Sequence, residues 1–85
     1  MNKIMPDEDQ VTPFLLLLTA VEKTEEILNQ LRSMSEVVEG YIIYGEWDLI
    51  LKIRVKNLPD LTEIVMKLRK NAGIKKTSTL IALTE

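Results

Sequence analysis

The sequence predicts a single α+β domain of 85 residues with four strands and two helices in the order β-α-β-β-α-β. Three observations favour this fold. An apolar run lies near the N-terminus, two stretches carry apolar stripes at helical spacing, and two apolar strands are joined by a short glycine turn. Elements in this order form one antiparallel sheet with both helices on one face.

The first strand is expected at Thr12–Ala20, after a flexible tail at residues 1–11 that is rich in acidic residues. The domain proper is therefore expected at residues 12–85. The continuous apolar run at residues 14–18 predicts burial on both faces and a central place in the sheet. A short buried helix would show the same run. However, the run is too short for a good helix, and Pro13 suits the start of a strand.

Two segments have the spacing of amphipathic helices. In Glu22–Met34 the stripe consists of Thr24, Ile27, Leu28 and Leu31. In Leu58–Asn71 the stripe consists of Leu61, Ile64, Val65 and Leu68. Asn57 or Leu58 is the expected N-cap of the second helix, Pro59 suits its first turn, and Gly73 is its expected stop signal.

The remaining strands are expected at Val37–Tyr44, Asp48–Val55 and Lys75–Leu83. Apolar residues alternate along the third strand, which predicts that one face packs on a core. The resulting fold is a ferredoxin-like βαββαβ sandwich with the first and third strands in the centre. Its second sheet face has no helix but is apolar in the first strand, so we expect a dimer in which two sheets pack face to face.

Composition excludes several classes of function. The chain has no His and no Cys, which excludes zinc-thiolate sites, disulfides and most nucleophile–base catalytic sets, so we expect no enzyme, metal or cofactor. The net charge of −2 argues against direct nucleic-acid binding. Its apolar runs are too short to cross a bilayer and no export signal is evident, so a cytoplasmic protein is expected. With 46% hydrophobic residues, so small a chain favours an oligomer.

The hairpin turn Tyr44–Asp48 is the candidate binding site. Gly45 can adopt a positive φ, and a turn of this kind leaves backbone N–H groups exposed that can hold a carboxylate. Asp48 can meet a cation, so the turn could bind both ends of a zwitterion. The plainer interpretation is that Gly45 and Asp48 only shape the hairpin. Trp47 is either an interface anchor, the cap of a pocket, or a side chain packed on its own domain.

Two further sets of charged residues are more simply interpreted as solvent-exposed surface than as functional sites. Glu46 and Asp48 are too few carboxylates for a calcium site, and exposed carboxylates on a hairpin are more often solvated than catalytic. A basic cluster could contact phosphates, but it is also what the end of a soluble helix carries; its members are Lys67, Arg69, Lys70, Lys75 and Lys76.

The stretch 36–53 resembles the C-terminal effector domain of Lrp/AsnC transcription regulators. The family's hairpin has a Gly-x-x-Asp pattern followed by hydrophobic residues, and here Gly45-Glu46-Trp47-Asp48 precedes residues 49–51. The run 73–83 is similar to the family's closing strand, with Thr77 and Thr79 at its polar positions. The resemblance covers about residues 12–84.

This resemblance implies the fold of a RAM domain, a dimeric α+β barrel whose dimers assemble into rings, typically octamers of four dimers. Small effectors, usually amino acids, would bind in the cleft between neighbouring dimers. By motif match, Gly45, Glu46, Trp47 and Asp48 would line that cleft, and Thr77 and Thr79 would reach it from a neighbouring subunit.

The chain differs from family members in that no helix-turn-helix half precedes the first strand. It therefore resembles a stand-alone effector domain that would act by co-assembling with full-length Lrp/AsnC regulators or by buffering their effector. Two rivals remain open: a small dimeric α+β-barrel enzyme such as a monooxygenase, which the missing His disfavours, and an assembly domain without any ligand.

Overall fold

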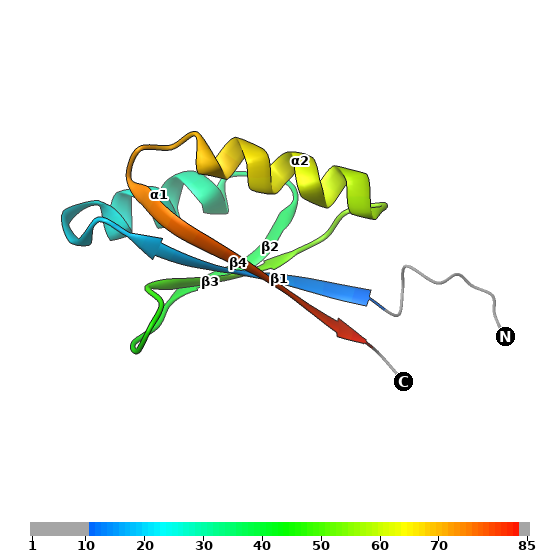
Figure 1. Ribbon diagram of the computed structural model, residues 1–85, viewed down its shortest axis with the longest axis horizontal. Helices are drawn as coiled ribbons and strands as arrows, with labels where there is room; N and C mark the ends of the chain where they lie inside the picture. The colour runs from blue at the N-terminus through cyan, green and yellow to red at the C-terminus, as the bar shows by residue number, and fades with distance from the viewer. Residues whose placement is uncertain (1–10, 84–85) are drawn as a thin grey trace, which may run out of the picture.

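The computed structural model describes residues 11–83, which form one sheet covered on one side by two helices (Figure 1). In chain order the elements are β1 (Val11–Thr19), a 3-10 turn η2 (Val21–Lys23), α1 (Thr24–Arg32), β2 (Val37–Ile42), β3 (Leu49–Ile53), α2 (Leu58–Arg69) and β4 (Ile74–Leu83). The expected tail at residues 1–11 lies outside the described residues except for Val11, which begins β1. No helix in the described part of the chain is both long enough and apolar enough to cross a membrane.

The strand order in the sheet is β2-β3-β1-β4, and all neighbouring strands are antiparallel. The first and third strands are therefore central, which confirms the predicted ferredoxin-like βαββαβ arrangement. In each βαβ unit the two strands are separated by one strand of the other unit: β3 lies between β1 and β2, and β1 lies between β3 and β4. Both helices lie against the same face of the sheet (Figure 1).

Pro13 lies within β1 rather than at its start, at a point where the strand has a partner on one side only. Pairing of β1 with β3 begins at Phe14, whereas pairing with β4 extends back to Val11. The first residues of β1 thus behave locally as a sheet edge, where a residue without an N–H is tolerated.

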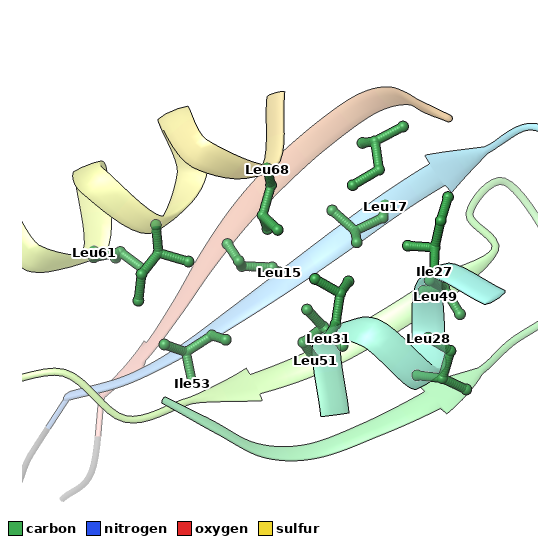
Figure 2. Packing of buried hydrophobic residues seen from close by; sticks show 12 residues of the cluster. Leu15, Leu17, Ile27, Leu28, Leu31, Leu49, Leu51, Ile53, Leu61 and Leu68 are labelled. Atoms are coloured by element: carbon green, nitrogen blue, oxygen red, sulfur yellow. The ribbon is translucent and has the colours of Figure 1, made fainter. Parts of the chain in front are cut away.

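The core lies between the helices and the inner face of the sheet, and Figure 2 shows the side chains of β1 and β3 directed toward both helices. Alternation places Leu15 and Leu17 of β1 and Leu49, Leu51 and Ile53 of β3 on this face. The helix stripes meet them with Ile27, Leu28, Leu31, Leu61, Ile64 and Leu68, and Ile74 of β4 completes a cluster in which no side chain is more than 8% exposed. The predicted stripes are therefore the buried faces of the helices.

The two helices begin differently. No side chain caps α1, which follows directly from η2. By contrast, α2 begins after Asn57, whose Oδ1 accepts a hydrogen bond from the Asp60 N–H at 2.9 Å, and Pro59 lies in its first turn. Asn57 is therefore the N-cap of α2.

Replacing Asn57 by Ala is expected to lower the free energy of unfolding by about 1 kcal/mol, because the Asp60 N–H loses its acceptor. Urea denaturation monitored by circular dichroism measures this loss. Asn57→Asp keeps an acceptor oxygen and is the matched control. Equal stability of the Ala and Asp variants would show that the cap does not stabilise the helix.

Gly73 does not stop α2 in the way that the sequence suggested. The helix ends at Arg69, and its C-cap residue Lys70 has the backbone dihedral angles of a right-handed helix. Among the described residues the glycine with a positive φ is Gly45, so Gly73 does not form a left-handed cap. A Cβ at position 73 would lie only 2.9 Å from Ile27 Cδ1. Gly73 therefore permits close packing of the α2–β4 connection on α1, and its N–H is bound by Asn71 Oδ1 at 2.8 Å.

Candidate functional site

The candidate site is the loop between β2 and β3, which is longer than the predicted turn. The expected strands 37–44 and 48–55 are shorter in the structure, so the loop runs from Ile43 to Asp48. The Ile43 N–H donates to the Asp48 carbonyl at 2.9 Å and closes the loop. Gly45 lies at its exposed tip with φ 126°, a conformation that other residues rarely adopt.

The amides of Gly45, Glu46 and Trp47 donate no hydrogen bond to any residue between 11 and 83. Gly45 and Glu46 are exposed and Trp47 is half-buried. Successive N–H groups without internal partners in a turn can accommodate a carboxylate or another small anion. The structure thus places these three sequence-predicted residues together, with donors available to a ligand.

Asp48 has a structural role that the sequence did not indicate. Its Oδ2 accepts from the Thr19 N–H at 2.8 Å and from the Thr19 hydroxyl at 3.3 Å, and its own N–H donates to the Leu17 carbonyl at 2.9 Å. These bonds tie the loop to the end of β1. Only Oδ2 is used in these contacts, which leaves Oδ1 as the oxygen with which Asp48 could bind a ligand cation.

A second threonine extends this network to the first helix. Thr19 is only 3% exposed, and its hydroxyl lies 2.6 Å from the hydroxyl of Thr24, the first residue of α1. Because a carboxylate only accepts, the Thr19 hydroxyl is the donor in its bond to Asp48, whereas either hydroxyl can donate in the bond between Thr19 and Thr24. The signal for this network was present in the sequence: Thr19 continues the buried positions 15 and 17, and a buried hydroxyl requires a partner.

Trp47 contacts a residue that the sequence placed only in the basic cluster. The Lys76 ammonium lies 5.7 Å from the centre of the Trp47 ring, within the range of a cation–π interaction. Lys76 belongs to β4 and pairs with Leu18 of β1, so its side chain reaches across the central strand to the loop. The interaction brings a positive charge close to the loop at Trp47.

Thr77 and Thr79 are not beside the loop in this chain. They pair with Leu17 and Leu15, whose side chains point into the core, and paired residues of an antiparallel ladder share a face. Both threonines therefore lie on the helix side of β4, separated from the loop by β1. Their predicted approach from a neighbouring subunit stays a prediction.

The face of the sheet opposite the helices is apolar along β1, with Lys52 and Lys76 beside it on the neighbouring strands. Phe14, Leu16 and Leu18 of β1 alternate with the core residues and are half-buried, as is Ile50 of β3, which pairs with Leu16 and Tyr41. Tyr41 is 52% exposed, and its hydroxyl donates to Glu39 Oε1 at 2.9 Å, which raises the pKa of Tyr41 above its usual value. A face of this composition is suited to association.

Carboxylates do not gather into a metal site in the part of the chain that the structure describes. Glu46 is exposed on the loop, and the nearby Asp48 is engaged with Thr19. The geometry of the loop therefore favours anion binding through backbone amides over cation binding through carboxylates.

Comparison with known proteins gives a consistent result. A family model described as the Lrp/AsnC ligand binding domain matches residues 14–85. The chain is 36% identical over 59 residues to an HTH-type transcriptional regulator of Pyrococcus furiosus, a match that covers 68% of this chain and 39% of the regulator. The chain thus spans well under half the length of that relative.

Solved structures match over nearly the whole domain. A protein of Pyrococcus horikoshii is 45% identical, with a TM-score of 0.79 and coverage of 88% of this chain and 92% of that chain. A transcriptional regulator of Neisseria meningitidis, solved as a complex with L-Met, is 16% identical with a TM-score of 0.79 over 100% of this chain and 60% of that chain, a likeness of fold.

Proposed function

Since the chain belongs to the family of Lrp/AsnC ligand-binding domains, we propose that it is a non-enzymatic module that senses an amino acid and controls assembly in Lrp/AsnC-type transcription regulation. The homologues are transcriptional regulators, which supports a regulatory sensing role over an enzymatic one.

The observation that carries this proposal is the row of unbonded amides at Gly45, Glu46 and Trp47. An amino-acid carboxylate has the charge and size that such a turn accepts. The positive φ of Gly45 fixes the loop shape that exposes these amides, and the Lys76 ammonium near Trp47 adds favourable charge.

The ammonium group of the effector requires an acceptor. Asp48 Oδ1 is one candidate, and the hydroxyls of Thr77 and Thr79 from a neighbouring subunit are the others. Trp47 would then limit the size of effector side chain that fits. The L-Met complex of the Neisseria meningitidis regulator supports an amino acid as the class of effector.

Assembly follows from the apolar sheet face. Two copies packed through the face that includes Phe14, Leu16 and Ile50 form a homodimer, and dimers meeting at the Gly45–Asp48 loop form a larger ring, with an octamer as the expected size. An effector bound at each seam stabilises the ring by about 2.7 kcal/mol per site at a hundredfold excess over its dissociation constant. The module would act in the cytoplasm by co-assembling with full-length Lrp/AsnC regulators, without contacting DNA or a membrane itself.

A thermal-shift screen over the amino acids, run beside light scattering, tests the proposal. A cognate effector at saturating concentration should raise the melting temperature on the order of 10 °C and favour the larger assembly. Melting and assembly that are indifferent to every amino acid would instead support a pure assembly domain, in which Asp48 and Gly45 only shape the hairpin.

Gly45→Val should abolish the effector response and leave the dimer intact. Valine is strained at φ 126°, so the loop must change shape and the amides move, while the sheet face is untouched. Ser35→Val is the matched control, because it adds the same side chain at an exposed position at the opposite end of β2. If Gly45→Val still responds like the Ser35→Val protein, the loop is not the binding site.

A further inference from the structure

The outer edge of the sheet at β2 carries an unusual contact. The Arg32 side chain, from the last residue of α1, donates from both Nε and Nη2 to the carbonyl oxygen of Gly40, at 3.2 and 2.7 Å. A hydrogen bond from a charged guanidinium is stronger than one between neutral groups, and the two-donor geometry fixes its direction. The contact covers Gly40, which is buried although it lies in an edge strand.

The strand register shows which way this carbonyl points. Ile43 N–H donates to Asp48 C=O, so that pair is hydrogen-bonded, and along an antiparallel ladder hydrogen-bonded and non-hydrogen-bonded pairs alternate. Counting back through the pairs Ile42↔Leu49, Tyr41↔Ile50 and Gly40↔Leu51 makes Gly40 and Ile42 the non-hydrogen-bonded positions. Their N–H and C=O groups therefore face away from β3, toward the outside of the sheet.

This edge is complementary to itself. A two-fold axis through Tyr41 would place Gly40 of each copy opposite Ile42 of the other copy. The N–H and C=O groups of these residues that face away from β3 would then meet those of the second copy in an antiparallel ladder. A hollow of about 360 Å³ lies along the same edge, lined by Leu28, Arg32, Ile42 and neighbouring residues. It offers space beside Arg32, the residue bound to the Gly40 carbonyl, for the Ile42 side chain of the second copy, and that side chain is 42% exposed here.

We propose that the outer edge of β2 is a pairing surface for β2 of a second copy of this chain, and that Arg32 limits this pairing by occupying the Gly40 carbonyl. Of the four backbone hydrogen bonds that the two-fold ladder can form, the two that use the Gly40 carbonyls compete with Arg32. This surface is distinct from the apolar sheet face and from the Gly45–Asp48 loop, so it neither requires nor excludes effector binding.

Replacing Arg32 by Ala tests the proposal. The apparent dissociation constant of the assembly step that joins β2 edges should fall at least tenfold, measured by light scattering and sedimentation across a dilution series. Arg69→Ala is the matched control, because Arg69 is the last residue of α2 and is also exposed, and its replacement also removes one positive charge. An Arg32→Ala protein that associates no more tightly than Arg69→Ala would overturn the proposal.

A second substitution identifies the edge. Ile42→Pro removes an outward N–H and no bond to β3, and proline is tolerated at sheet edges. Added to Arg32→Ala, it should return the association to the level of the unsubstituted protein. If the association of the double variant stays tight, the contact does not use β2 and the assignment is wrong.

Amide hydrogen exchange tests the pairing residue by residue, independently of the assembly mass that light scattering and sedimentation report. In the Arg32→Ala protein, exchange at Gly40 and Ile42 should slow at least tenfold between dilute and concentrated samples, while the amides of the exposed residues Lys56 and Asn57 keep their rates. Thermal melting of each variant confirms that it is folded. Exchange at Gly40 and Ile42 that is unchanged by concentration would also reject the pairing.

Discussion

Replacing Leu51 by Ala is expected to lower the free energy of unfolding by about 2–5 kcal/mol, a large part of the stability of a domain of this size. Leu51 is fully buried in a central strand, where it pairs with Leu15 of β1 and with Gly40 of β2. A Cβ on Gly40 would lie 3.0 Å from its Cδ2, which shows how closely the strand and side chain are packed. Chemical denaturation measures the loss.

Ile50→Ala provides the matched control in the same strand. Ile50 is half-buried on the opposite face of the sheet, where no helix packs. Its truncation should cost much less stability in dilute solution and should act mainly on association. Equal losses at positions 50 and 51 would contradict the assignment of the core to the helix side.

Asp48→Ala is expected to cost about 1–3 kcal/mol, although Asp48 lies in a loop and is only half-buried. The substitution leaves the buried Thr19 N–H without its acceptor at 2.8 Å and ends the chain of hydrogen bonds that reaches Thr24. Thermal and urea denaturation, without effector, measure the effect.

Glu46→Ala is the control for Asp48, because it removes an exposed carboxylate from the same loop. Asp48→Asn keeps an oxygen that can accept from Thr19 and should lose less than Asp48→Ala. In a double-mutant cycle with Thr19→Val, the two substitutions should be non-additive because they share one hydrogen bond. Losses at Asp48 no larger than at Glu46 would show that the network is not stabilising.

Most of the fold could be predicted from the sequence because hydrophobic spacing determines it. The alternation at residues 49–53 and the stripe at Ile27, Leu28 and Leu31 are the buried faces that the structure shows. The ends of the elements were less predictable: β2 stops at Ile42 and β3 starts at Leu49, since the residues between them form a loop closed by one backbone bond.

The candidate site was predictable only in part. Its loop could be found from Gly45, but the contact of Trp47 with Lys76 depends on how β4 aligns with β1, and spacing along one strand does not report that alignment. A register shift between Leu18 and Thr19 complicates it further. Lys76 was therefore missed as a site residue, whereas Thr19 was missed although its buried position was a signal for it. The binding role of Gly45, Glu46, Trp47, Asp48, Thr77 and Thr79 stays a prediction.

The pairing of β1 with β4 has a consequence for how the chain folds during translation. These strands are the first and last of the described chain, and Val11 lies opposite Leu83. On the ribosome, β1 can join β3 early, but its other side stays unpaired until the final strand has emerged. Bringing such distant segments together slows folding and exposes an apolar strand edge to aggregation while synthesis is incomplete.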